Sequence, residues 1–238
     1  MKLVWVMLMS AMLVAAGAAA QCPADKAAEM GHSGFETFHH VMAPAWHHAY
    51  PDSNFDALIE AGPKFKEAFV EIQAMRPEFK SDVKKAHFNE CRKEFGNLVE
   101  QYAAACAEGD KDKAYALMPD LHTAFERSAA ALMPISYKEF EALKVTLGLI
   151  VNEHLPANNH EGIVGSTETL VTKAASLNEE SLPNLLVWSK DDILKRFESI
   201  QALTTKLKEC CDNNDMAAYS EHAAALNAQV TEFGERYL

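Results

Sequence analysis

The chain has 238 residues, a formal net charge of −12 at pH 7, and 49% hydrophobic and 24% charged residues. Such an acidic surface argues against nucleic acids and anionic lipids as partners. The length allows one large domain or two small ones. Only 10 glycines and 9 prolines, together with abundant Ala, Leu, Glu and Lys, favour helices over strands.

The first twenty residues have the pattern of a secretory signal peptide. A positive charge at Lys2 precedes the apolar run Leu3–Ala16, and three alanines precede Gln21. We therefore expect removal of residues 1–20 and a periplasmic or secreted protein, because the apolar run is too short for a good membrane span. We expect no transmembrane segment in the mature chain. A lipid anchor at Cys22 is the less favoured alternative, since lipoprotein signals usually carry a small residue where this chain has Gln21.

Five cysteines remain in the mature chain: Cys22, Cys91, Cys106, Cys210 and Cys211. An exported protein can keep disulfides, and an odd number leaves at least one thiol without a partner in the chain. Cys91 and Cys106 fall on one expected helix about 22 Å apart, so they cannot pair with each other. If a disulfide forms, we expect it between Cys106 and Cys210 or Cys211.

Apolar residues recur at helical spacing in four segments, 88–106, 115–132, 140–154 and 216–237. No stretch of the mature chain shows the alternation of a strand. Proline or polar turns separate the expected helices at Pro51-Asp52, Arg76-Pro77, Glu108-Gly109-Asp110, Met133-Pro134, Leu182-Pro183 and residues 212–215. The sequence therefore predicts an all-α protein, an antiparallel helical bundle.

Similar features recur about 105 residues apart in the two halves of the chain. They are Cys106 with Cys210, Tyr115 with Tyr219, and Pro51 with Pro156. We interpret them as an internal duplication that produces two tandem four-helix units. The predicted units are residues 21–133, which carry a histidine cluster, and residues 134–238.

The histidine cluster lies in the segment 39–48, which holds four of the ten histidines. On a regular helix His40 and His47 share a face, because they are seven residues apart. Imidazole is the commonest protein ligand of transition metals. The segment therefore predicts a site for zinc, copper, nickel or iron, with His40, His47, His48 and His122 as ligands and His39 in reserve. Met42, and Met118 if it packs close by, would add soft ligands suited to copper(I).

A competing interpretation treats these histidines as solvated surface residues. It follows if the buried stripe of this helix is Phe35, Phe38, Met42, Ala45 and Ala49. In that case His40 and His47 point outward. The chain would then be a structural or interaction protein of the cell envelope, with another envelope protein as its partner.

His122 lies in an apolar stripe between Met118 and Phe125, so we expect it to face the bundle interior. A buried imidazole needs a hydrogen-bonding partner or a metal. Glu126 follows one turn later on the same face. Together with Glu36-Thr37-Phe38-His39, the pair permits a second alternative, a di-iron redox protein.

An exported helical chain with an inward His122 and with Met42 on its first helix resembles the periplasmic four-helix-bundle haem proteins of the cytochrome c-prime class. The resemblance covers residues 35–132. It implies a haem held without covalent attachment (b-type) between Met42 and His122, because the chain lacks the Cys-x-x-Cys-His motif of that class. The chain also lacks a phosphate-binding loop, Gly-x-Ser-x-Gly and His-Glu-x-x-His, so the sequence favours a metal- or haem-binding protein over an enzyme.

Overall fold

A computed structural model describes Pro23, Ala27 and residues 32–238 of the chain. These residues form helices and connecting turns and contain no strand, which confirms the all-α prediction. No helix among them is long and apolar enough to cross a bilayer. The predicted signal peptide and Cys22 lie outside the described residues.

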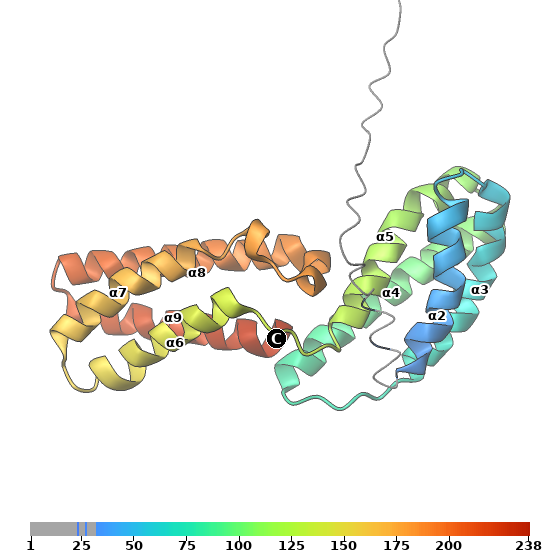
Figure 1. Ribbon diagram of the computed structural model, residues 1–238. Helices are drawn as coiled ribbons and strands as arrows, with labels where there is room; N and C mark the ends of the chain where they lie inside the picture. Colours follow the sequence, from blue (N-terminus) through green and yellow to red (C-terminus); the bar gives the residue numbers. More distant parts are fainter. Residues whose placement is uncertain (1–22, 24–26, 28–31) are drawn as a thin grey trace, which may run out of the picture.

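The first group of helices packs each element against the next along the chain (right-hand group in Figure 1). It contains α2 (Ser33–Pro44) with its π-helical continuation η1 (Ala45–Ala49), α3 (Phe55–Ala74), α4 (Asp82–Glu108) and α5 (Lys111–Ala130). Asn54, Ser81 and Asp110 cap the helices that follow them by accepting a backbone N–H bond. The turns predicted from the sequence therefore separate these helices.

The second group repeats this arrangement on the other side of a junction (Figure 1). It contains α6 (Lys138–Leu149) with π-helical η2 (Ile150–His154), α7 (His160–Ala175), the 3₁₀ turns η3 (Glu179–Ser181) and η4 (Asn184–Ser189), α8 (Lys190–Asp212) and α9 (Met216–Tyr237). The predicted boundary after residue 133 falls in the segment that joins α5 to α6.

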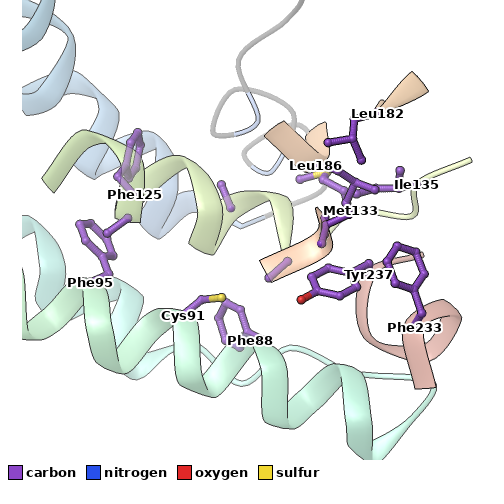
Figure 2. Close-up of a cluster of buried hydrophobic side chains, with 14 of the residues drawn as sticks. Phe88, Cys91, Phe95, Phe125, Met133, Ile135, Leu182, Leu186, Phe233 and Tyr237 are labelled. Carbon is purple, nitrogen blue, oxygen red and sulfur yellow. The ribbon is translucent and has the colours of Figure 1, made fainter. Parts of the chain in front are cut away.

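The apolar stripes predicted from the sequence face the interior. Their buried members include Phe88, Phe95, Phe125, Phe140 and Phe233. The core continues through the junction, where one buried cluster includes Cys91 and Phe88 of α4, Tyr237 of α9 and Leu186 of η4 (Figure 2). The two groups of helices therefore share one core, although each has its own turns and caps.

Local geometry recurs at a constant offset of 105 residues. The π-helical turn at 45–49 has a counterpart at 150–154. Ser53 and Asn158 both adopt a positive φ of 51°, and the next residue in each case, Asn54 or Asn159, caps a helix. These features agree with an internal duplication, which stays a prediction.

The described cysteines Cys91, Cys106, Cys210 and Cys211 are all free thiols. The expectation that Cys91 and Cys106 do not pair is confirmed. The expected bridge from Cys106 to Cys210 or Cys211 is wrong, because Cys106 lies near the end of α4 and the other two near the end of α8. These helix ends are at opposite extremes of the molecule (Figure 1), beyond the reach of a disulfide.

Candidate functional site: a cavity at the junction of the two helix groups

A cavity of about 270 Å³ lies where α2, η1 and α5 of the first group meet η4 of the second. Pro23 and Ala43 contribute to its wall. The other lining residues are His39, Met42, Trp46 and His47 from α2 and η1, His122 and Glu126 from α5, and Asn184, Leu185 and Trp188 from η4. The cavity thus gathers three histidines, one carboxyl group and one thioether.

The π-helical turn η1 decides which histidines reach the cavity. In this turn the backbone N–H of Tyr50 donates to the carbonyl of Ala45 five residues earlier, at 2.8 Å. A π turn holds more residues than an α turn, so side chains beyond it are rotated relative to a regular helix. As a result His39 and His47, eight residues apart, both line the cavity.

The predicted ligand His40 is placed elsewhere. Its side chain is 77% exposed, and its Nε2 lies 3.9 Å from Oε1 of Glu36 on the outer side of α2. The prediction that His40 shares a face with His47 assumed 3.6 residues per turn throughout, and η1 breaks that regularity. His39, the reserve ligand, takes the position at the cavity.

The predicted ligand His48 is exposed and is not among the described residues that line the cavity. The stripe that the competing interpretation proposed is buried as stated, at Phe35, Phe38, Met42, Ala45 and Ala49. That interpretation therefore describes His40 and His48 correctly. It is also correct that His47 is exposed, although the side chain of His47 lies at the mouth of the cavity.

His122 occupies the inner wall of the cavity, and only 9% of the residue is exposed. Its ring stacks on Trp46 with centroids 4.1 Å apart and planes 9° from parallel, and it meets Trp188 edge-on at 5.5 Å. Burial, and then the electrostatic effect of His47 and His39, lowers the pKa of His122 to about 4. The imidazole is therefore uncharged at neutral pH and keeps a lone pair that can bind a metal.

Glu126 lies one turn beyond His122 on the same face of α5 and is 3% exposed. Its Oε1 is 3.8 Å from Nε2 of His122. This separation is too long for a hydrogen bond. It is close to the roughly 3.4 Å expected between two ligand atoms that each lie about 2.1 Å from a tetrahedral metal ion.

In this arrangement the side chains of the cavity are too far apart to enclose an ion. Among the described residues, no three His, Cys, Asp or Glu side chains are close enough together to hold a metal. His39 is half-buried and His47 is exposed at the mouth, so a metal site here requires their side chains to turn toward His122.

The residues predicted to bind a haem all line the cavity, whereas those predicted to bind two iron ions do not. Met42 and His122, the expected haem ligands, both line the cavity. Of the expected di-iron residues, His39, His122 and Glu126 line it as well, whereas Glu36 is 61% exposed beside His40. The Glu-x-x-His pair of Glu36 and His39 is therefore divided between the outside of α2 and the cavity.

The residues from η4 could not be found from the sequence. Asn184, Leu185 and Trp188 lie on a six-residue 3₁₀ turn, which has no helical periodicity to read. Only the packing of η4 against α5 places Trp188 beside His122.

Comparison of the chain with protein-family models, with curated proteins and with solved structures gave no match.

Proposed function

We propose that the protein binds one transition-metal ion in the junction cavity, through the imidazoles of His39, His47 and His122. The observation that carries this proposal is the convergence of these three side chains on one cavity of about 270 Å³. Imidazole nitrogen is a good ligand for zinc, copper and nickel. Glu126, 3.8 Å from His122, supports the proposal because a carboxylate at that distance can bind the ion or orient the imidazole.

Binding requires a rearrangement of side chains at the mouth of the cavity. His39 and His47 must turn inward, and ordering each side chain costs about 1 kcal/mol. Metal–imidazole bonds exceed this cost, since structural zinc sites contribute about 10 kcal/mol or more. His122 already sits inside the cavity in its neutral form, so it needs no rearrangement and no loss of a proton.

Pairs of adjacent histidines provide matched variants for the test. Isothermal titration with Zn²⁺, Ni²⁺ and Cu²⁺ should show one ion per chain for the wild type. His39→Ala and His47→Ala should each weaken binding about tenfold or more. His40→Ala and His48→Ala change the neighbouring exposed residue and should leave the affinity within twofold. Equal affinities in all four variants would reject the site and favour the structural or interaction protein of the cell envelope.

The cavity favours a metal ion over a haem. Its volume of about 270 Å³ lies just below the range of roughly 300–1,000 Å³ for pockets that hold organic ligands. The ring of His122 is also packed against two indoles. We expect no Soret band from protein purified from its native compartment. A Soret band that disappears in a Met42→Leu or His122→Asn variant would support a b-type haem and the resemblance to the cytochrome c-prime class.

We further propose that the protein acts outside the cytoplasm. The support is the pattern of residues 1–20, which is that of a signal peptide. N-terminal sequencing of the natural protein should begin at Gln21. A diacylglyceryl group on Cys22 would show a lipid anchor instead.

A further inference from the structure

We infer that the ion selected by the junction cavity is copper(I), and that Met42 supplies the thioether that selects it. This inference rests on the proposed function, because it names the ion for the same three histidines. The observation behind it is the sulfur-containing side chain in the cavity wall, on the same face of α2 and η1 as two of the imidazoles.

Met42 lies between His39 and His47 in the sequence. It follows His39 by three residues and precedes His47 by five, a spacing that η1 makes compatible with one face. All three residues line the cavity, and Met42 is 1% exposed. A thioether in this position is already desolvated and needs no large movement to reach an ion that the imidazoles hold.

The chemistry of the donor atoms separates copper(I) from the divalent ions. Imidazole binds zinc, nickel and both copper ions, so the three histidines alone do not select among them. A thioether is a soft ligand that favours copper(I) and contributes little to Zn²⁺ or Ni²⁺. Three nitrogens and one sulfur make a four-coordinate set that needs no water ligand.

The apolar walls of the cavity also favour copper(I) over a divalent ion. Trp46, Leu185 and Trp188 form an apolar surround. The cost of removing an ion from water rises with the square of its charge, so these apolar walls penalise a divalent ion more than a monovalent one. Glu126 is the oxygen donor on the opposite wall, and it is the side chain that a divalent ion would use instead.

Two methionines give a matched pair of variants. Met42→Leu removes the thioether from the cavity wall. Met118→Leu makes the same change at a fully buried residue of α5 that is not among the described residues lining the cavity. Both replacements nearly conserve volume, so both variants are expected to fold. Far-UV circular dichroism and urea unfolding check this directly.

The experiment compares two ions in the wild type and in the variants Met42→Leu, Met118→Leu and Glu126→Gln. Copper(I) affinity is measured without oxygen by competition with a chromophoric copper(I) chelator, and zinc affinity by isothermal titration. We expect Met42→Leu to weaken copper(I) binding at least tenfold and to change zinc binding less than threefold. Met118→Leu should change neither. X-ray absorption of the copper(I) form should show a sulfur neighbour in the wild type that is missing in Met42→Leu.

The outcomes distinguish this inference from the proposed function. If metal binds but Met42→Leu leaves the copper(I) affinity within twofold, or weakens both ions equally, copper(I) selection by Met42 is wrong and the histidine site stands. If the wild type binds neither of these ions, the copper(I) inference fails; if it also binds neither Ni²⁺ nor Cu²⁺, the proposed function fails with it. Glu126→Gln completes the comparison, because it should weaken zinc more than copper(I), and the reverse result would also overturn the inference.

Discussion

The imidazole of His122 lies almost flat on the indole of Trp46, with ring centroids 4.1 Å apart and planes 9° from parallel. On the other side of the same stack, Trp46 meets Tyr50 at 5.1 Å, and Tyr50 meets Tyr115 at 4.5 Å. The stack joins α5 to η1 and fixes the inner wall of the cavity. Trp46 is therefore the residue on which the position of His122 depends.

Trp46→Leu should lower the free energy of unfolding by about 2 kcal/mol, because it removes buried area and two aromatic contacts of roughly 0.5–1.5 kcal/mol each. Urea unfolding followed by circular dichroism measures the change. Trp188→Leu is the comparison, since Trp188 contacts His122 only edge-on at 5.5 Å, and its loss should cost less. Equal stability of Trp46→Leu and the wild type would show that the stack does not hold α5 to η1.

Replacing either of two glycines by alanine should change the stability of the protein, and the two changes should have opposite signs. A Cβ on Gly62 of α3 would lie 2.5 Å from Cβ and 2.7 Å from Sγ of Cys106 on α4. Gly62→Ala should therefore destabilise the protein by about 1–3 kcal/mol through overpacking.

Gly165 of α7 has open space at the same position, so Gly165→Ala should stabilise the helix by about 0.5–1 kcal/mol. Chemical denaturation of the two variants under identical conditions checks both signs. A Gly62 variant as stable as the wild type would mean that α3 and α4 separate without cost, contrary to the packing described here.

His87 should make the fold sensitive to acid. This residue of α4 is 3% exposed at the junction. Burial, and after it the positive charges of Arg236, Arg127 and Lys84, lowers the pKa of His87 to about 3. An unfolded chain takes up this proton near pH 6.5, whereas the folded protein does not until about pH 3. The stabilising contribution is therefore complete above pH 6.5 and is lost as the pH falls toward 3.

The expected loss from His87 is about 1.4 kcal/mol per pH unit in that window, or roughly 2 kcal/mol at pH 5. His122 adds a loss of the same sign, because its pKa is also lowered. Unfolding free energies between pH 7.5 and 4.5 should show a shallower slope in His87→Gln. Replacement of the exposed His160 by Gln should keep the wild-type slope. A His87 variant with the full slope would assign the acid sensitivity to other groups.

We expect Tyr237 of α9 to make the two groups of helices unfold together. It is 3% exposed, its ring lies 5.0 Å from that of His87, and its hydroxyl donates to the carboxylate of Asp192. Tyr237→Ala leaves a cavity at the junction and should cost about 3–5 kcal/mol. Unfolding monitored by tryptophan fluorescence and by circular dichroism should then give two midpoints in place of one.

Tyr237→Phe retains the ring and should cost only about 1 kcal/mol, with coincident transitions. If the Ala variant also unfolds in one step by both probes, the junction does not depend on this side chain.

The buried faces of the helices could be predicted from the sequence, because apolar spacing is a local property. The stripe from Phe88 to Cys106 is an example, since its burial depends only on the helical repeat. The π-helical turn was not predictable in the same way. Nothing in the segment 45–49 indicates an extra residue in the turn. The wider turn rotates His47 toward the face of His39, whereas a regular helix would place it on the face of His40.

Contacts between distant segments were the other part that sequence reasoning missed. Trp188 reaches His122 only because η4 packs on α5. The expected bridge from Cys106 failed for a related reason. Equivalent positions in two similar halves suggested proximity, whereas the junction joins the halves by the ends opposite to those cysteines (Figure 1).

The walls of the cavity belong to both groups of helices. A bound molecule or ion can therefore affect how the two groups dock on each other. An occupant that needs η4 as well as α5 binds only while the two groups are docked, so it shifts the equilibrium toward the docked arrangement by mass action. At one hundred times its dissociation constant, such an occupant adds about 2.7 kcal/mol to the docked state. For such an occupant, the fraction of molecules with the two groups docked rises with the concentration of that solute.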